Sequence, residues 1–261
     1  MAGFCPLFSG SSGNCTYIAA EGTGLLIDAG VSARRIEQAL TAHEIDPRSV
    51  AAIAVTHEHS DHIAGLRVLC KRYGYRLIAS EGTLRGVAKA GIPVSSEDVI
   101  GPEGVTVGSL QLRAFPTPHD TPESTGYAVT LPDGRRVAVA TDMGHMTERI
   151  LQELCGCDAV LIESNHDVCM LKNGPYPYVL KQRILSERGH LSNEACDAAL
   201  PALVQSGVKY LYLGHLSREN NRPELAYRAA QEALQRAGIR VGTDCRLGVA
   251  PPEAALPTLW L

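Results

Sequence analysis

Short apolar runs alternate with longer mixed stretches along the 261 residues of the chain. Apolar runs of about four to eight residues bounded by Gly, Pro, Asp or Ser are typical of strands. They predict strands at residues 15–18, 24–27, 50–55, 76–79, 105–107, 110–115, 126–131, 136–140, 159–162, 209–213 and 240–241. The longer stretches predict helices at residues 33–43, 62–73, 83–90, 147–154, 178–187, 192–206 and 223–237.

Turn and cap residues support these boundaries. Ser192 stands where an N-cap side chain would accept a hydrogen bond, and Gly156 is expected to end the helix before it. Residues 132–135 read Pro-Asp-Gly-Arg between two predicted strands, which indicates a hairpin turn whose Asp-Gly pair supplies positive φ values. The proline-rich tail, residues 251–261, is expected to be irregular.

The order of these elements is neither a strict βαβ repeat nor all-β. Mixed sheets with helices packed on their outer faces fit it best. The sequence shows no internal repeat at a fixed short period, no low-complexity segment and no linker. We therefore expect a single domain over residues 1–261, long enough to bury a substantial core.

Composition narrows the class of protein. A hydrophobic share of 45% and a charged share of 20% are ordinary for a globular protein. No apolar run approaches the ~20 residues of a membrane span, and the first residues do not resemble a signal peptide. The eight scattered cysteines predict reduced thiols and a cytoplasmic location. The formal net charge of -4 gives no general attraction to nucleic acid, although an enzyme can still carry a local basic patch.

The densest chemistry lies at residues 56–62, which read Thr-His-Glu-His-Ser-Asp-His. Imidazole is the commonest metal ligand, and carboxylate suits harder ions. His57 and His59 point to the same side of an extended chain, whereas Asp61 and His62 follow at a turn and can face a second point nearby. A polar turn capped by Asp61 is the alternative, but four ligand-type residues at this spacing favour two metal ions. The H-E-x-x-H pattern of metalloproteases is absent, because its second His is missing.

Three further ligand-type residues come after predicted strands in the same way. His119, Asp142 and His215 each stand just downstream of an apolar run, as His57 does. Each alone is explained equally well as a loop, turn or cap residue. Together they place ligand chemistry at four strand ends, where loops are free to carry functional groups and the sheet holds them rigidly.

This order of residues resembles the metallo-β-lactamase fold superfamily. Within that superfamily the chain is similar to the bacterial WalJ/YycJ-type metallohydrolases. The segments that carry the two similarities are residues 9–15, 26–30, 57–62, 163–167, 174–177, 181–185, 188–193 and 215–221. The resemblance covers nearly the whole chain. It implies an α/β fold, an αββα sandwich of two mixed β-sheets with helices on the outer faces and a dinuclear site at one edge.

The resemblance also implies which side chains hold the metals. One ion would be held by His57, His59 and His119, the other by Asp61, His62 and His215, with Asp142 as a bridge between them. Two divalent ions placed in this way share a hydroxide and clamp the attacking and leaving oxygens. His-rich ligation suits Zn²⁺, and the two carboxylates leave Mn²⁺ as the alternative.

Other side chains are expected close to these metals. Asp28 would orient a ligand, with a plain turn residue as the alternative. Ser11 and Asn14 belong to a small-residue turn whose amides could form an anion nest. His166 is a candidate for the pocket wall, with an ordinary loop histidine as the alternative. Local phosphate contacts could come from Arg183, Arg188, Arg218 and Arg222.

His190 distinguishes between classes of substrate. It stands in Gly-His-Leu-Ser-Asn, residues 189–193, at a predicted helix N-terminus, a position that favours an anion. Phosphodiesterases of the superfamily, such as tRNA 3′-processing and mRNA-processing nucleases, carry a similar Gly-His-x-Ser element whose His contacts the phosphate or protonates the leaving oxygen. Small-molecule thioesterases and lactonases of this fold lack it. Asp61 and His190 are therefore the expected catalytic pair, and Ser192 and Asn193 are expected to assist.

The resemblance thus implies a metal-dependent hydrolase, a 5′→3′ exonuclease acting on DNA. The alternative is a small-molecule hydrolase, such as a thioesterase, lactonase or cyclic phosphodiesterase, which the modest charge favours. The complete ligand set argues against a non-enzymatic, regulatory metal protein. Asp142 and His190 are too close in sequence for the large inserted domain of other nucleic-acid-processing members. DNA is therefore expected to dock on the core surface or on the partner in a homodimer, with no membrane involved.

Overall fold

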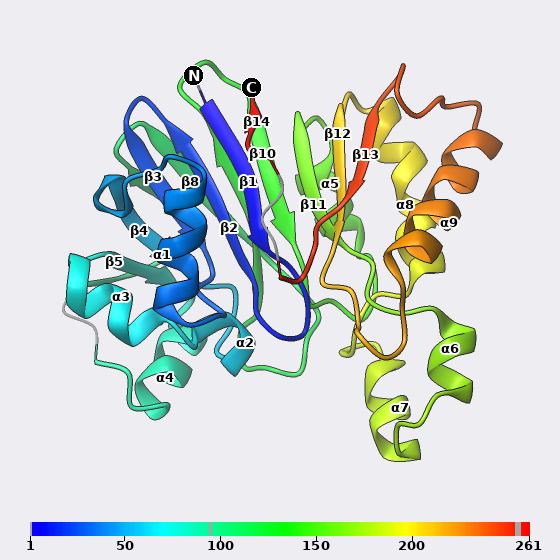
Figure 1. Ribbon diagram of the computed structural model, residues 1–261, viewed down its shortest axis with the longest axis horizontal. Helices are drawn as coiled ribbons and strands as arrows, with labels where there is room; N and C mark the ends of the chain where they lie inside the picture. Colours follow the sequence, from blue (N-terminus) through cyan, green and yellow to red (C-terminus); the bar gives the residue numbers. More distant parts are fainter. Residues whose placement is uncertain (1, 94–95, 254–256) are drawn as a thin grey trace.

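The computed structural model describes residues 2–93, 96–253 and 257–261, and these form two β-sheets packed face to face (Figure 1). In order across the first sheet, the strands are β14 (Leu259–Trp260), β1 (Ala2–Phe8), β2 (Cys15–Ala20), β3 (Thr23–Ile27), β4 (Val50–Ala54), β5 (Arg76–Ala79) and β6 (Glu97–Val99). In the second sheet they are β13 (Arg246–Val249), β12 (Tyr210–Gly214), β11 (Ala159–Glu163), β10 (Arg136–Ala140), β9 (Thr125–Thr130), β8 (Leu110–Pro116) and β7 (Val105–Val107). Both sheets mix parallel and antiparallel pairs.

Helices cover the outer faces of the two sheets. On the side of the first sheet lie α1 (Ala33–Ala42), α2 (Ser60–Ile63), α3 (Leu66–Tyr73), α4 (Glu81–Lys89) and the short 3₁₀ turn η1 (Pro47–Ser49). On the side of the second lie α5 (Glu148–Leu154), α8 (Asn193–Gln205) and α9 (Pro223–Arg236), whereas α6 (Val168–Asn173) and α7 (Tyr178–Ile184) extend beyond the sheets (Figure 1). In the described part of the chain, no helix has both the length and the apolar character that a membrane crossing requires.

Successive side chains of a strand point to opposite faces of its sheet, and the buried ones form three separate hydrophobic cores. In β10, Val137 and Val139 pack between the two sheets, whereas Ala138 and Ala140 pack against the helices of the second sheet. In β3 the same alternation places Leu26 against the helices of the first sheet. Each fully buried aliphatic side chain contributes ~1.5–3 kcal/mol to folding. Three apolar layers separate four layers of structure, so the predicted αββα sandwich is confirmed.

The strand predictions miss the elements that depend on distant partners. Strand β1 contains Pro6 and a bulge in its pairing with β2, so its pattern is not that of a regular strand. The tail is not wholly irregular, because β14 pairs with Gly3 and Phe4 of β1. The strand expected at 240–241 is wrong: Val241 makes only an isolated bridge, and β13 begins five residues after it.

The helix expected at residues 62–73 is broken into α2 and α3 at Gly65. A Cβ atom at Gly65 would lie 2.5 Å from the carbonyl oxygen of Val31, so only glycine allows this close approach. The amide of Gly65 donates to the carbonyl of Ala29 at 2.8 Å. The break leaves Asp61 and His62 on a separate short turn. At the predicted hairpin, Gly134 has a φ of +85°, but Asp133 does not share the positive φ.

Candidate metal centre

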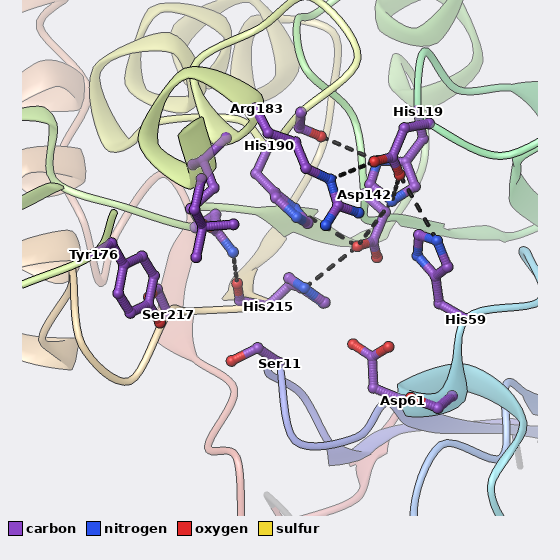
Figure 2. A pocket seen from close by; sticks show the side chains of 16 residues that line it. Ser11, His59, Asp61, His119, Asp142, Tyr176, Arg183, His190, His215 and Ser217 are labelled. Carbon is purple, nitrogen blue, oxygen red and sulfur yellow. Dashed lines mark hydrogen bonds and ion pairs between the residues drawn. The ribbon is translucent and has the colours of Figure 1, made fainter. Parts of the chain in front are cut away.

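Strands of both sheets end at one site, and ligand-type side chains follow them (Figure 2). His57 and His59 follow β4 in the sequence, and Asp61 comes next, on α2. His119 follows β8, and Asp142 follows β10. The last residue of β11 is Glu163, and His215 comes directly after β12. The strand-end positions expected from the sequence therefore meet in space.

The predicted ligands form two neighbouring groups. Ligand atoms lie within 4.8 Å of one another in the group His57, His59 and His119 and again in the group Asp61, His62 and His215. Asp142 lies between the groups, with its Oδ2 3.3 Å from Nε2 of His62 and its Oδ1 3.3 Å from Nε2 of His215. Its Oδ1 is also 4.0 Å from Nε2 of His119. This geometry suits a carboxylate between two ions.

The donor set fits divalent metal ions. Nε2 of His119 and Oδ2 of Asp142 are buried without a hydrogen-bond partner of suitable geometry in the described structure. Burial lowers the pKa of His57 and that of His119, so both rings are neutral at pH 7, as metal ligation requires. Burial alone would raise the pKa of Asp142, but the neighbouring His215 and His62 outweigh it and keep the carboxyl ionised.

Asp28 holds two of the histidines from behind. Its Oδ2 accepts a hydrogen bond from Nδ1 of His62 at 2.8 Å, and its Oδ1 accepts one from the backbone N–H of Thr56 at 2.8 Å. The hydroxyl of Thr56 donates to Asp28 as well and lies 3.1 Å from Nδ1 of His57. Burial would lower the pKa of His62, but the carboxylates of Asp28 and Asp142 outweigh it and raise that pKa. Both rings are thereby oriented with Nε2 toward the centre.

Backbone and amide groups orient two further rings. Nδ1 of His119 lies 3.0 Å from the carbonyl oxygen of Gly189, and Nδ1 of His215 lies 3.2 Å from Oδ1 of Asn14. Nδ2 of the same Asn14 lies 3.1 Å from Nε2 of His62. Asn14 therefore contacts ligands of the second group from the first loop of the chain.

Three backbone N–H groups of the small-residue turn are not free to bind an anion, so the prediction of an anion nest is wrong for them. The N–H of Gly10 donates to Oδ1 of Asn14, that of Gly13 donates to the carbonyl of Gly10, and that of Asn14 donates to the carbonyl of Asp61. The first two of these bonds hold the turn together, and the third ties it to the loop that carries Asp61. Ser11 does line the pocket.

Three residues of the site have left-handed backbone conformations. Asp28, Asp142 and His215 have φ values of 64°, 59° and 54°. Asp and His are tolerated there better than most side chains, but such a conformation still costs ~1 kcal/mol or more and persists only where the surroundings impose it. The fold therefore holds these side chains in place before any ligand binds.

Glu163 is one of the site residues that the sequence reasoning missed. It is fully buried, its Oε1 lies 2.8 Å from Nδ1 of His190, and its Oε2 accepts the backbone N–H of Met143 at 2.8 Å. Burial would lower the pKa of His190, but Glu163 outweighs it and raises that pKa to about 9. The His190 ring stacks on that of His215 with centroids 5.4 Å apart. An acidic residue at the end of an apolar strand, as at Asp142, was the available signal.

Three other residues predicted near the metals, Ser192, Asn193 and His166, contact the protein's own helix start and core rather than the pocket. The Ser192 hydroxyl accepts the N–H of Ala195 at the start of α8. Asn193 is buried and accepts the hydroxyl of Ser164 at 2.7 Å. His166 is only 1% exposed, and burial lowers its pKa to about 4. The residues described as lining the pocket include none of these three predicted positions.

A pocket of about 340 Å³ opens over the ligand groups (Figure 2). Of the four arginines expected near phosphate, Arg183 lines this pocket. Arg188 instead donates to backbone carbonyls, including that of His119.

The sequence reasoning also missed Asp120, whose Oδ2 accepts a hydrogen bond from Nε of Arg183 at 2.5 Å and whose Oδ1 lies 3.3 Å from Nε2 of His119. Burial would raise the pKa of Asp120, but Arg183 outweighs it and lowers that pKa.

Comparisons with known proteins agree with this geometry. The family model described as the beta-lactamase superfamily domain matches residues 23–216. Exodeoxyribonuclease YycJ of Bacillus anthracis is 37% identical over 258 residues, which cover 98% of this chain and 97% of that protein. Exodeoxyribonuclease WalJ of Streptococcus pneumoniae serotype 2 is 38% identical over 256 residues, which cover 96% of this chain and 95% of that protein.

A solved structure shows the same fold at low sequence identity. The crystal structure of Zn²⁺-bound PqqB from Methylobacterium extorquens matches with a TM-score of 0.69 and 17% identity, covering 98% of this chain and 99% of that one. The family model, the near full-length relatives and the αββα architecture agree. The chain therefore belongs to the metallo-β-lactamase fold superfamily and, within it, to the WalJ/YycJ type.

Proposed function

We propose that the protein is a dinuclear metal-dependent phosphodiesterase that removes nucleotides from DNA as a 5′→3′ exonuclease. The observation that carries this proposal is the position of His190, which lines the same pocket as Asp142 and is held by a buried carboxylate. The names of the YycJ and WalJ relatives, both exodeoxyribonucleases, support DNA as the substrate.

In this proposal the two ligand groups each hold one divalent ion. His57, His59 and His119 would hold the first and Asp61, His62 and His215 the second, with the Asp142 carboxylate available to both. Bound there, the ions would act as Lewis acids that lower the pKa of water and stabilise charge on the attacking and leaving oxygens. The Zn²⁺-bound neighbour supports zinc, whereas the two carboxylates suit Mn²⁺ as well.

The protein's own groups would complete the reaction. Glu163 engages Nδ1 of His190, which leaves Nε2 as the nitrogen available to the substrate. A protonated His190 can donate its proton to the leaving oxygen, a role that contributes ~10²–10⁴-fold. Asp61, a quarter exposed at the pocket, orients the attacking oxygen from the opposite side. Asp28 and Asn14 keep the ligating rings aligned.

The test is a substrate panel with a matched control. Labelled single- and double-stranded DNA, RNA, cyclic nucleotides and thioesters are incubated with the protein in Zn²⁺ or Mn²⁺. We expect stepwise loss of nucleotides from one end of DNA, slowed by about 10²–10⁴-fold in His190→Ala and retained in His145→Ala, whose exposed ring lies outside the pocket. Hydrolysis of thioesters or cyclic nucleotides without DNA cleavage would establish the small-molecule alternative.

Three further expectations are part of the proposal. The pairing of β14 with β1 joins the two ends of the described chain in one sheet, which supports a single domain over residues 1–261. Buried thiols such as Cys15 and Cys196 pack as small apolar side chains, which suits a reducing cytoplasm. A homodimer would enlarge the DNA-binding surface, and sedimentation analysis of the purified protein would decide its presence.

A further inference from the structure

The pocket over the metal centre has two chemically different walls. One wall carries the ligand groups, among them His59 and Asp61. The other carries Tyr176, Leu180 and Ile184. In the view of Figure 2, Tyr176 and His59 lie on opposite sides of the pocket, with Asp142 between them. A ligand at the metals would therefore meet an aromatic and aliphatic surface on its far side.

Two of these three wall residues, Leu180 and Ile184, belong to a helix that takes no part in the core, and Tyr176 comes just before it. Helix α7 has no buried residue, and it extends beyond the sheets together with α6 (Figure 1). Leu180 and Ile184 lie one turn apart on α7 and so share one side of the helix, whereas Tyr176 lies in the bend just before it. All three line the pocket. The ammonium group of Lys181 donates to the carbonyls of Lys172 and Gly174 and so fixes the turn between the two helices.

Core packing cannot explain the apolar side of α7, because that side faces the pocket rather than the sheets. A binding function explains it better, since apolar and aromatic side chains with a few placed polar groups are typical of ligand sites. Arg183 supplies such a polar group: only its Nε is engaged among the described contacts, by Asp120, so its terminal nitrogens remain for a phosphate oxygen. The wall thus combines a stacking surface with a cation beside it.

We propose that Tyr176 and Leu180 form a subsite for the base of the nucleotide next to the scissile phosphate, with Arg183 contacting its backbone. This inference rests on the proposed function. The pocket volume of about 340 Å³ suits a single nucleotide rather than a duplex, since sites for small ligands begin at ~300 Å³. Continuity with the metal centre places the base on the wall while the phosphate reaches His190.

The experiment removes one side chain and one base separately and together, as in a double-mutant cycle. The wild type, Tyr176→Ala and Tyr176→Phe, all metal-loaded, are assayed on two oligonucleotides that differ only in whether the terminal nucleotide of the attacked end carries its base or is abasic. Tyr178→Ala is the matched control: its ring is 74% exposed, two residues away, and does not line the pocket. Initial rates for the first cleavage give kcat and KM separately.

Removing the base should cost the wild type about 5- to 150-fold in kcat/KM, the range expected for one base stacked on an aromatic ring. The loss should appear mainly in KM, because stacking is present in ground and transition states alike. Tyr176→Ala should lose a similar factor on the intact oligonucleotide and almost nothing on the abasic one. Tyr176→Phe and Tyr178→Ala should behave as the wild type does.

Two outcomes would overturn the subsite. One is a wild type that cleaves both oligonucleotides equally well. The other is a Tyr176→Ala protein whose loss is the same on both, which would make Tyr176 a structural residue. If the wild type cleaves no oligonucleotide at all but hydrolyses small esters, the proposed function itself fails and the subsite with it. The first two results leave the nuclease assignment intact, so the two failures can be told apart.

Discussion

Nδ1 of His190 lies 2.8 Å from Oε1 of Glu163, a carboxylate that is completely buried. The two residues come from different elements, Glu163 from the end of β11 and His190 from the loop before α8. An imidazole held in this way keeps one orientation and its proton, and with Glu163, Asp142 and His215 it forms a further group of closely spaced ligand-type atoms. This pairing makes His190 suited to donate a proton at the metal centre.

His190→Ala should lower kcat by about 10²–10⁴-fold while both metal ions are retained. The loss should shrink for bis-p-nitrophenyl phosphate, because its leaving group needs no proton. Metal analysis and steady-state kinetics on DNA and on this ester provide the comparison, with His145→Ala as the control. An equal loss on good and poor leaving groups would mean that His190 only binds phosphate.

Glu163→Gln should lower kcat through His190 rather than through an independent effect. Glutamine keeps an oxygen that can accept the N–H of Met143 but removes the charge that holds the imidazolium. The double variant Glu163→Gln/His190→Ala should therefore be no slower than His190→Ala alone, since residues of one unit are not additive. If the two losses multiply, Glu163 acts separately from His190.

Asp61→Ala should reduce turnover on the order of 10³-fold or more with the protein still folded. The carboxylate belongs to the second ligand group and faces the pocket. Protein purified without chelator should contain close to two equivalents of divalent metal, and the variant should contain less. Circular dichroism checks the fold. Near-wild-type activity in this variant would contradict the proposed role of Asp61.

Asp28→Asn should weaken metal binding by about 10–100-fold, because the carboxylate orients ligating rings without touching the ions. The amide cannot accept from His62 and Thr56 together as the carboxylate does. Competition with a coloured chelator measures the affinity. Asp46→Asn, an exposed aspartate at the start of η1, is the control and should bind metal as the wild type does. Equal metal affinities in the two variants would show that Asp28 has no part in metal binding.

Asp197 should make the stability depend on pH. This α8 carboxyl is 7% exposed, and burial raises its pKa from 3.8 to about 7. The folded protein therefore holds the proton more tightly than the unfolded chain. The cost of ionising this buried carboxyl in the folded protein is absent below about pH 4, grows as the pH rises, and is complete above about pH 7.

Asp197→Asn should consequently be more stable than the wild type by ~2–4 kcal/mol at pH 8, but by no more than ~1 kcal/mol at pH 4.5. Asparagine has the same shape but cannot ionise, so the difference reports this one carboxyl. Urea unfolding of both proteins at several pH values gives the comparison. A difference in unfolding free energy that does not change with pH would show that Asp197 is not the titrating group.

Much of the metal centre could be predicted from the sequence because its signals are local. Within residues 56–62 the spacing alone decides which side chains face together, and the alternation of apolar residues marks the strands whose ends carry His119, Asp142 and His215. Most strands and helices follow from the same periodicities, whereas their division into two packed sheets was implied by the resemblance to the superfamily. These patterns depend on neighbours a few residues apart, which is the range that a sequence shows directly.

Only the tertiary structure decided how distant segments meet. Gly30 is one example, since a Cβ there would lie 1.6 Å from the carbonyl of Asp61, thirty-one positions away. The pairing of β1 with β14, the buried contact of Glu163 with His190 and the apolar side of α7 are others. In each case the side chain is ordinary for its local element, and its role comes from a partner that chain folding brings near. Proximity between remote segments is set by packing of the whole sandwich, and no local spacing encodes it.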